Sequence, residues 1–97
     1  MNRFSSLTIS KHVLKNRLVV APMASQTSTL DGKVTDKTLR HYANLAQSQA
    51  GLVMVEYSFV AFSGRSEPNQ LGVYDDDCIA GITAIAKAIH QAGAKAG

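Results

Sequence analysis

Two short apolar runs, each followed by a long polar segment, constrain this chain more than any other feature. The run Leu18–Ala21 ends at Pro22, which has no backbone N–H and therefore ends a strand. The run Leu52–Glu56 ends in a charge. Continuous apolar runs that contain valine are typical of strands buried on both faces of a parallel sheet. The sequence therefore predicts two such strands, with loops at their carboxyl ends.

Two amphipathic patterns predict helices after these strands. Thr35 or Asp36 can cap a helix that runs to about Gln49. The aspartates Asp75–Asp77 mark the start of a second helix, because carboxylates favour the positive end of the helix dipole, and Gly93 marks its end. The positions predicted to be buried are Leu39, Tyr42, Ala43 and Ala46 in the first helix, and Ile79, Ile82, Ile85, Ala86 and Ile89 in the second.

The remaining segments complete an alternating order of strands and helices. Leu7 and Ile9 alternate with polar residues and residues 10–12 can turn, so residues 7–13 predict a hairpin. Residues 94–97 would lead into a third strand. Strands that alternate with helices indicate parallel βαβ units. We therefore expect an α/β fold whose ligand site lies at the carboxyl ends of the strands.

Composition and charge argue against several classes of protein. Hydrophobic residues make up 45% of the chain and charged residues 18%, which is typical of a globular protein. The formal net charge is +3, and the basic residues Arg3, Lys11, Lys15 and Arg17 are spread across the hairpin without interleaved aromatic residues. This pattern predicts solvated surface and no nucleic-acid partner. No stretch approaches the roughly 20 apolar residues that a membrane helix needs, so we expect no membrane partner.

Cysteine and histidine usage predicts neither a disulfide nor a metal site. Cys78 is the only cysteine, which fits a reducing compartment, and the first six residues contain no apolar signal region. We therefore expect a cytoplasmic protein. The aspartates beside Cys78 oppose thiolate formation, so we expect this thiol to be inert and partly buried. His12, His41 and His90 lack metal-ligand spacing and are expected at the surface.

Several segments, in their order and spacing, resemble the Old Yellow Enzyme family of FMN-dependent NAD(P)H:flavin oxidoreductases. They are Leu14–Met23, Tyr42–Ala43, Gly51–Glu56, Gly64–Arg65 and Ile89–Ala94, and the resemblance covers essentially the whole chain. It implies a (β/α)8 TIM barrel of about 250 residues, closed at its bottom by an N-terminal hairpin. Residues 1–97 would then be the N-terminal part of this single domain: the hairpin and the first two βα units, truncated before the third strand.

The resemblance also implies a cofactor site. In this family the Ala-Pro-Met turn lies beside the flavin ring, so Ala21, Pro22 and Met23 would contact FMN, with the Met23 backbone along the ring edge. Many relatives have Cys or Thr at the position of Ala24, where they reach the flavin. Alanine cannot donate that hydrogen bond, so the contact is lost or replaced. Ser25 could substitute for it, although we expect a solvated loop serine.

Two residues at the end of the second strand bear on the same site. Tyr57 stands where the family usually has Ala or Gly, and it would either cover the ring edge or turn out into the loop. Glu56 is expected to be a structural carboxylate that bonds to nearby loop backbone. The resemblance therefore assigns five residues to the cofactor, namely Ala21, Pro22, Met23, Ala24 and Tyr57.

The activity that the resemblance implies is hydride transfer from NAD(P)H, through FMN, to an activated alkene such as an enone or a dienoyl compound. The groups that hold the substrate, donate the proton and bind the flavin phosphate are expected outside this chain. No residue of the chain is therefore predicted to be catalytic, and the fragment alone is expected to be inactive.

Two alternatives remain open. One is another FMN-dependent or phosphate-binding barrel enzyme. The other is a non-catalytic α/β remnant or interaction module. Because a truncated barrel exposes open strand edges and an uncovered apolar face, we expect a homo-oligomer or self-association of this chain.

Overall fold

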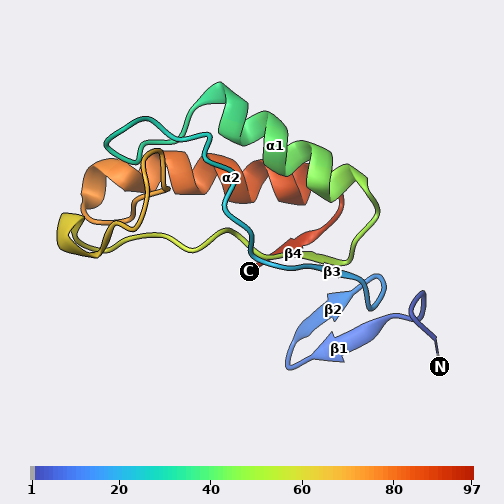
Figure 1. Cartoon of the computed structure of the whole chain (residues 1–97). Helices are drawn as coiled ribbons and strands as arrows, with labels where there is room; N and C mark the ends of the chain where they lie inside the picture. The colour runs from blue at the N-terminus through green and yellow to red at the C-terminus, as the bar shows by residue number, and fades with distance from the viewer. Residues whose placement is uncertain (1) are drawn as a thin grey trace.

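The computed structural model describes residues 2–97, in which two helices pack on one face of a short parallel sheet (Figure 1). The elements in chain order are β1 (Leu7–Ile9), β2 (His12–Leu14), β3 (Val19–Val20), α1 (Asp36–Gln47), β4 (Leu52–Val53), α2 (Ile79–Gln91) and β5 (Lys95–Ala96). Two short 3₁₀ helices, η1 (Phe62–Gly64) and η2 (Asp76–Cys78), lie between β4 and α2. The predicted α/β class is confirmed.

The N-terminal hairpin forms where the alternating pattern predicts it. Strands β1 and β2 pair antiparallel, with Leu7 opposite Leu14 and Ile9 opposite His12. Ser10 in the turn has a φ of 53°, in the left-handed region. The hairpin lies beside one end of the sheet and buries Leu14 (Figure 1).

The sheet contains three parallel strands in the order β3-β4-β5, with Val19 opposite Leu52 and Val53 opposite Ala96. The expectation that the chain stops before the third strand is therefore wrong, because Lys95 and Ala96 already belong to it. Backbone bonds hold this strand in place: Gly97 N donates to Val53 O at 3.0 Å, and Val55 N donates to Gly97 O at 2.8 Å. Pairing with β4, rather than its own composition, makes this segment a strand.

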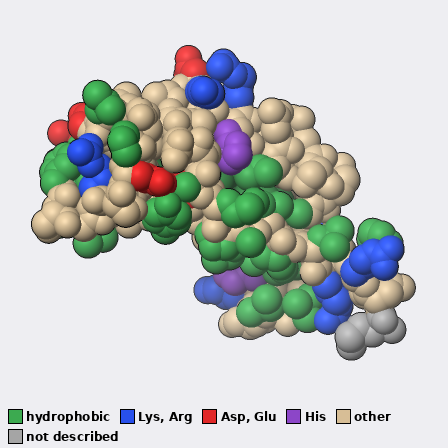
Figure 2. All heavy atoms as spheres, in the orientation of Figure 1, with side chains coloured by type: hydrophobic (Ala, Val, Ile, Leu, Met, Phe, Trp, Pro, Cys, Tyr) green, Lys and Arg blue, Asp and Glu red, His purple; other side chains and the backbone are tan. Residues whose placement is uncertain are grey.

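The regular strands are shorter and less covered than the apolar runs suggest. Only Val19–Val20 of the first run and Leu52–Val53 of the second are strand. The prediction that the first strand is buried on both faces is wrong, since Val19 remains 52% exposed and the helices cover one face. Figure 2 shows hydrophobic side chains gathered below the helices, over the region of the strands.

The starts of the two helices differ in how well the sequence predicts them. Thr35 caps α1 as predicted, and Thr35 and Thr38 form a reciprocal capping box. Helix α2 begins at Ile79, after the 3₁₀ helix that Asp75 caps. This offset leaves Ile79 58% exposed, so its predicted burial is wrong. The later positions Ile85 and Ile89 are buried as predicted.

The core lies between the helices and the sheet. Its buried residues are Tyr42, Ala46, Val53, Leu71, Ile85, Ile89 and Ala94. Complete burial of a large apolar side chain contributes about 1.5–3 kcal/mol. Leu71 belongs to the long segment between β4 and α2 and therefore ties that segment to the core. Among the described residues, no helix has the length and apolar character that crossing a membrane requires.

Candidate functional site

Two long segments leave the carboxyl ends of neighbouring strands and meet on the same side of the molecule (Figure 1). Residues 21–35 follow β3, and residues 54–75 follow β4. Gly72 N donates to Gly32 O at 2.9 Å, and the Asn69 side chain donates to Ser28 O at 2.8 Å. Parallel α/β folds bind ligands at this end of the sheet, so the meeting of these segments marks the candidate site.

The segment Ala21–Ala24 follows β3 directly and consists of exposed residues, except for the partly buried Ala24. Ala21, Pro22 and Met23 are exposed, and Met23 exposes 61% of its surface. Within residues 2–97, the N–H groups of Met23 and Ala24 make no hydrogen bond. Accessible backbone donors next to a proline turn suit the polar edge of a flat ring such as that of FMN, so the donor set fits this cofactor.

Glu56 lies under the same segment and is only 3% exposed. Its Oε2 accepts from Ser25 N at 3.0 Å, and its Oε1 accepts from Ser25 Oγ at 2.7 Å and from the Tyr42 hydroxyl at 2.9 Å. The prediction of a structural carboxylate bonded to loop backbone is confirmed. The prediction that Ser25 is a solvated loop serine is wrong, because both its N–H and its hydroxyl bond to Glu56.

Tyr42 connects this carboxylate to helix α1. Its hydroxyl also accepts a hydrogen bond from Glu56 N at 2.9 Å. Burial raises the pKa of the Tyr42 hydroxyl well above its ordinary value, and the hydrogen bond to the Glu56 carboxylate adds to this effect. The hydroxyl therefore keeps its proton and remains a donor to Glu56.

A chain of hydroxyl groups continues from Ser25 to the start of α1. The Ser25 and Thr27 hydroxyls lie 2.8 Å apart, and Thr27 Oγ1 donates to Thr38 Oγ1 at 2.8 Å. Thr35 Oγ1 donates to Thr27 O at 2.6 Å. The loop after β3 is thus bonded to β4 at one end and to the α1 cap at the other.

Tyr57 follows Glu56 but points into the long loop. Its hydroxyl donates to Glu67 Oε1 at 2.7 Å, and this hydrogen bond raises the pKa of the exposed Tyr57 hydroxyl. Gln26 Nε2 donates to the other oxygen of the same carboxylate at 3.3 Å. Of the two orientations expected for Tyr57, the structure has the one toward the loop.

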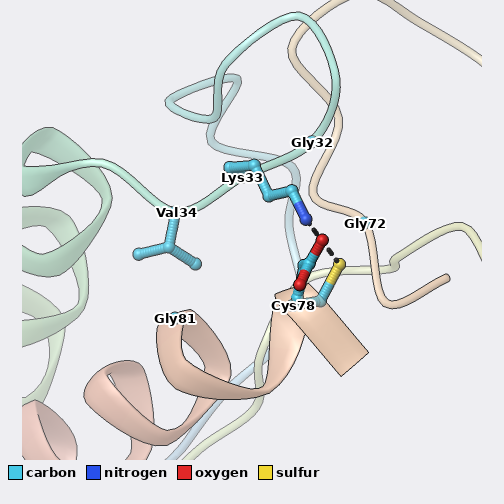
Figure 3. Close-up of a pocket in the computed structure, with 7 residues that line it drawn as sticks. Gly32, Lys33, Val34, Gly72, Cys78 and Gly81 are labelled. Atoms are coloured by element: carbon cyan, nitrogen blue, oxygen red, sulfur yellow. Dashed lines mark hydrogen bonds between the residues drawn. The ribbon is translucent and has the colours of Figure 1, made fainter. Parts of the chain in front are cut away.

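A small cavity of about 100 Å³ lies behind the meeting point of the two segments (Figure 3). Lys33 points toward Cys78 there, with Nζ 3.8 Å from Sγ and 3.6 Å from Asp75 Oδ1. Cys78 is buried. Glycine is required in its wall, since a Cβ at Gly81 would lie 2.8 Å from the Val34 side chain. The cavity therefore reflects close approach of backbone segments.

The match to a known family covers almost the whole chain, residues 3–97. The chain belongs to the NADH:flavin oxidoreductase / NADH oxidase family. This confirms the resemblance to Old Yellow Enzyme inferred from the sequence segments.

Individual relatives agree with this assignment. The chain is 42% identical over 94 residues to an NADPH dehydrogenase of Halalkalibacterium halodurans, covering 96% of this chain and 28% of that protein. The crystal structure of Old Yellow Enzyme from Pichia sp. AKU4542 matches with a TM-score of 0.89 at 29% identity, over 98% of this chain and 25% of that one. The homologue from Zymomonas mobilis matches with a TM-score of 0.88 at 25% identity, over 99% and 26%.

The chain therefore spans about a quarter of the length of these relatives. Of the five residues predicted to contact the cofactor, Ala21, Pro22, Met23 and Ala24 form one continuous segment in this structure. The fifth residue, Tyr57, donates its hydroxyl to Glu67 in the long loop. Sequence reasoning missed the contribution of Ser25 and Thr27. The sequence signal that could have revealed it is the run of serines and threonines after the first strand, together with Glu56 at the end of the second.

Proposed function

We propose that this chain forms the flavin-contacting start of an FMN-dependent oxidoreductase, with Ala21, Pro22, Met23 and Ala24 against the cofactor. The observation that carries the proposal is that the N–H groups of Met23 and Ala24, at the carboxyl end of β3, have no partner among residues 2–97, in a chain that belongs to a flavin oxidoreductase family. Tyr57 is proposed as a residue at the rim of the site, where Glu67 holds its hydroxyl.

The reaction proposed is reduction of an activated alkene. FMN held along Ala21–Ala24 would supply the redox chemistry, namely transfer of a hydride from NAD(P)H to one alkene carbon, with a proton added at the other. This chain would bind and orient the ring through its backbone, and we assign it no catalytic residue. The bacterial relative is an NADPH dehydrogenase, which supports NADPH as the reductant.

The architecture proposed is a (β/α)8 barrel, in which residues 1–97 are the N-terminal part of a single domain. The three parallel strands and the two helices on one face of the sheet support this arrangement. The sole cysteine supports a cytoplasmic location. We place the catalytic groups outside this chain, so residues 1–97 alone would be inactive.

The experiment uses the protein expressed from its complete reading frame. We expect it to purify with a flavin absorption band and to oxidise NADPH when cyclohex-2-enone is added. Ala24→Pro removes one of the free backbone donors and should reduce the FMN content. The matched control is Leu30→Pro, because Gly32 N donates to Thr29 O at 3.0 Å and position 30 is the second residue of that turn, where proline is favoured.

The proposal is contradicted if the wild-type protein is colourless and binds no added FMN. An Ala24→Pro protein with the same FMN content as the Leu30→Pro control would instead contradict the assignment of the contacting segment. The two results therefore test separately whether the protein binds FMN and whether Ala21–Ala24 contact it.

A second property follows from exposed apolar side chains on the hairpin and on β3. Ile9, Val13 and Val19 each expose more than half of their surface, and such patches favour association. We propose that residues 1–97 expressed alone self-associate, as an interaction module would. A sizing column should show dimers or larger species at micromolar concentration, and a well-folded monomer would contradict this.

A further inference from the structure

The segment Ala21–Ala24 forms a short arch, and the residues at its two ends bond to the chain that continues β4. At its start, Val20 O accepts from Met54 N at 3.0 Å. At its end, Ser25 N donates to Glu56 Oε2 at 3.0 Å. Met54 and Glu56 lie two residues apart on the chain that continues β4. The position of the four residues between Val20 and Ser25 is therefore set by β4 and its extension.

Burial of Glu56 at this position costs free energy, because a buried carboxylate loses its hydration. The ion pair found among residues 2–97, Lys33–Asp75, does not involve it. Its charge is compensated instead by three neutral donors: Ser25 N, Ser25 Oγ and the Tyr42 hydroxyl. Two of the three donors belong to Ser25, which follows the arch. The carboxylate therefore makes more hydrogen bonds to this loop than to helix α1.

The backbone beyond the arch shows why two bonds to Ser25 are needed. Gln26 has a φ of 55°, a left-handed conformation that side chains with a Cβ disfavour. Ser25 before it is held by Glu56, and Thr27 after it is held by Thr35 and Thr38. These bonds on both sides keep a disfavoured backbone conformation that an untethered loop would leave.

We propose that Glu56 is a positioning residue for the cofactor: through Ser25 it fixes the backbone of Ala21–Ala24 in the geometry that receives FMN. This inference rests on the proposed function and adds to it a residue that does not touch the flavin. Donors that are already in position bind a rigid ring without the cost of ordering a loop at the moment of binding.

The test compares three variants of the protein expressed from its complete reading frame. Glu56→Gln removes the charge and places an amide donor or a weaker acceptor against Ser25 N. Ser25→Ala removes the bonds of the Ser25 hydroxyl to Glu56 Oε1 and Thr27 Oγ1 and keeps the backbone bond to Glu56 Oε2. The control is Ser48→Ala, since Ser48 Oγ bonds to Leu45 O at the far end of α1, away from the arch.

Amide hydrogen exchange measures the arch directly and needs no activity. We expect exchange of the Ser25 amide, whose N–H bonds to Glu56 Oε2, to quicken at least about tenfold in Glu56→Gln, with residues 79–91 unchanged. The FMN dissociation constant should rise about tenfold in this variant and about threefold in Ser25→Ala, the range expected for loss of hydrogen bonds to a charged group. The Ser48→Ala control should stay within about twofold of wild type in both measurements.

The flavin absorption band at saturating FMN adds a readout that lower stability does not move. A changed band shape in Glu56→Gln supports a displaced ring environment. If residues 79–91 also exchange faster in Glu56→Gln, the whole fold has loosened. The FMN dissociation constant of Ser25→Ala then decides whether the bonds to Ser25 position the arch.

Two results would overturn the proposal. One is normal FMN affinity and an unchanged band in both Glu56→Gln and Ser25→Ala, which would leave the proposed function standing without a role for Glu56. The other is a wild-type protein that binds no FMN, which removes the proposed function and this role together.

Discussion

The two long loops of this protein are held by different kinds of interaction. The loop after β3 is held by directional polar bonds that Ser25 donates to Glu56 and Thr27 donates to Thr38. The loop after β4 is held by packed rings: Phe59 stacks on Tyr74 with centroids 5.4 Å apart and also contacts Phe62 at 5.2 Å. Both loops follow neighbouring strands at the same end of the sheet and are joined by polar bonds such as that from Asn69 to Ser28, yet the aromatic cluster belongs to the loop after β4.

The difference indicates that the two loops have different roles, one in ligand binding and the other in stability. A hydrogen bond fixes a backbone atom in distance and direction, which suits a segment that must present donors to a ligand. Aromatic packing is less directional and buries more surface, which suits a segment that covers the core. We therefore expect changes in the aromatic loop to affect stability most, and changes in the polar loop to affect the site at a smaller cost in stability.

The largest effect should come from the aromatic loop. Phe59→Ala removes a ring that is only 3% exposed, and the cavity should lower the free energy of unfolding by about 3–5 kcal/mol. Urea unfolding followed by circular dichroism measures this. The control is Phe4→Ala, whose ring is 63% exposed and should matter by less than about 0.5 kcal/mol. Equal losses in the two variants would contradict the conclusion that the packing of Phe59 stabilises the loop after β4.

The next effect should appear where the two loops touch. Gly32 has a φ of 86°, and a Cβ there would lie 2.9 Å from both Gly72 N and Phe59 Cζ. Gly32→Ala should therefore cost about 3 kcal/mol, from backbone strain and overpacking together. Gly64→Ala is the matched control, since a Cβ there meets nothing within 4 Å. If thermal unfolding shows the same small change for both, the loops do not pack as described.

A smaller loss is expected at Tyr42 and Glu56, which support the polar loop from α1 and from the end of β4. Tyr42→Phe keeps the buried ring but removes the hydroxyl that donates to Glu56 Oε1 and accepts from Glu56 N. We expect a loss of about 2 kcal/mol, because the Glu56 carboxylate and N–H both lose a partner in the core. Tyr57→Phe, which removes an exposed hydroxyl, should leave the urea midpoint unchanged. Equal midpoints for both variants would show that the Glu56 cluster adds no stability.

The pH dependence of the same pair should give the smallest effect. Burial raises the pKa of Tyr42 above its ordinary 10.0, so the folded state keeps a proton that the unfolded state releases above about pH 10. The contribution of Tyr42 to stability is therefore complete below about pH 10 and falls as the pH rises further. The stability gap between wild type and Tyr42→Phe should narrow as the pH rises above about 10 in urea titrations. A constant gap would show that the hydroxyl titrates alike in both states.

The sequence predicted most of what depends on neighbouring residues. The element order, the Thr35 cap and the buried stripe of Tyr42, Ala46, Ile85 and Ile89 follow from local patterns, and the structure has them. Glu56 was recognisable as structural because a charge at the end of a buried strand needs partners.

The failures depend on tertiary contacts. Ser25 bonds to a carboxylate 31 residues away, which no local pattern reveals. Ile79 is exposed because the 3₁₀ helix before it delays α2. Lys95–Ala96 becomes a strand through its bonds to β4, since its own residues carry no strand signal.

The most direct test of the account is amide hydrogen exchange at Met23 and Ala24, with and without FMN, in the protein expressed from its complete reading frame. Both N–H groups lack a partner within the described chain. The account predicts that FMN slows their exchange while that of α2 stays constant. Tight FMN binding with unchanged exchange at both residues would contradict it.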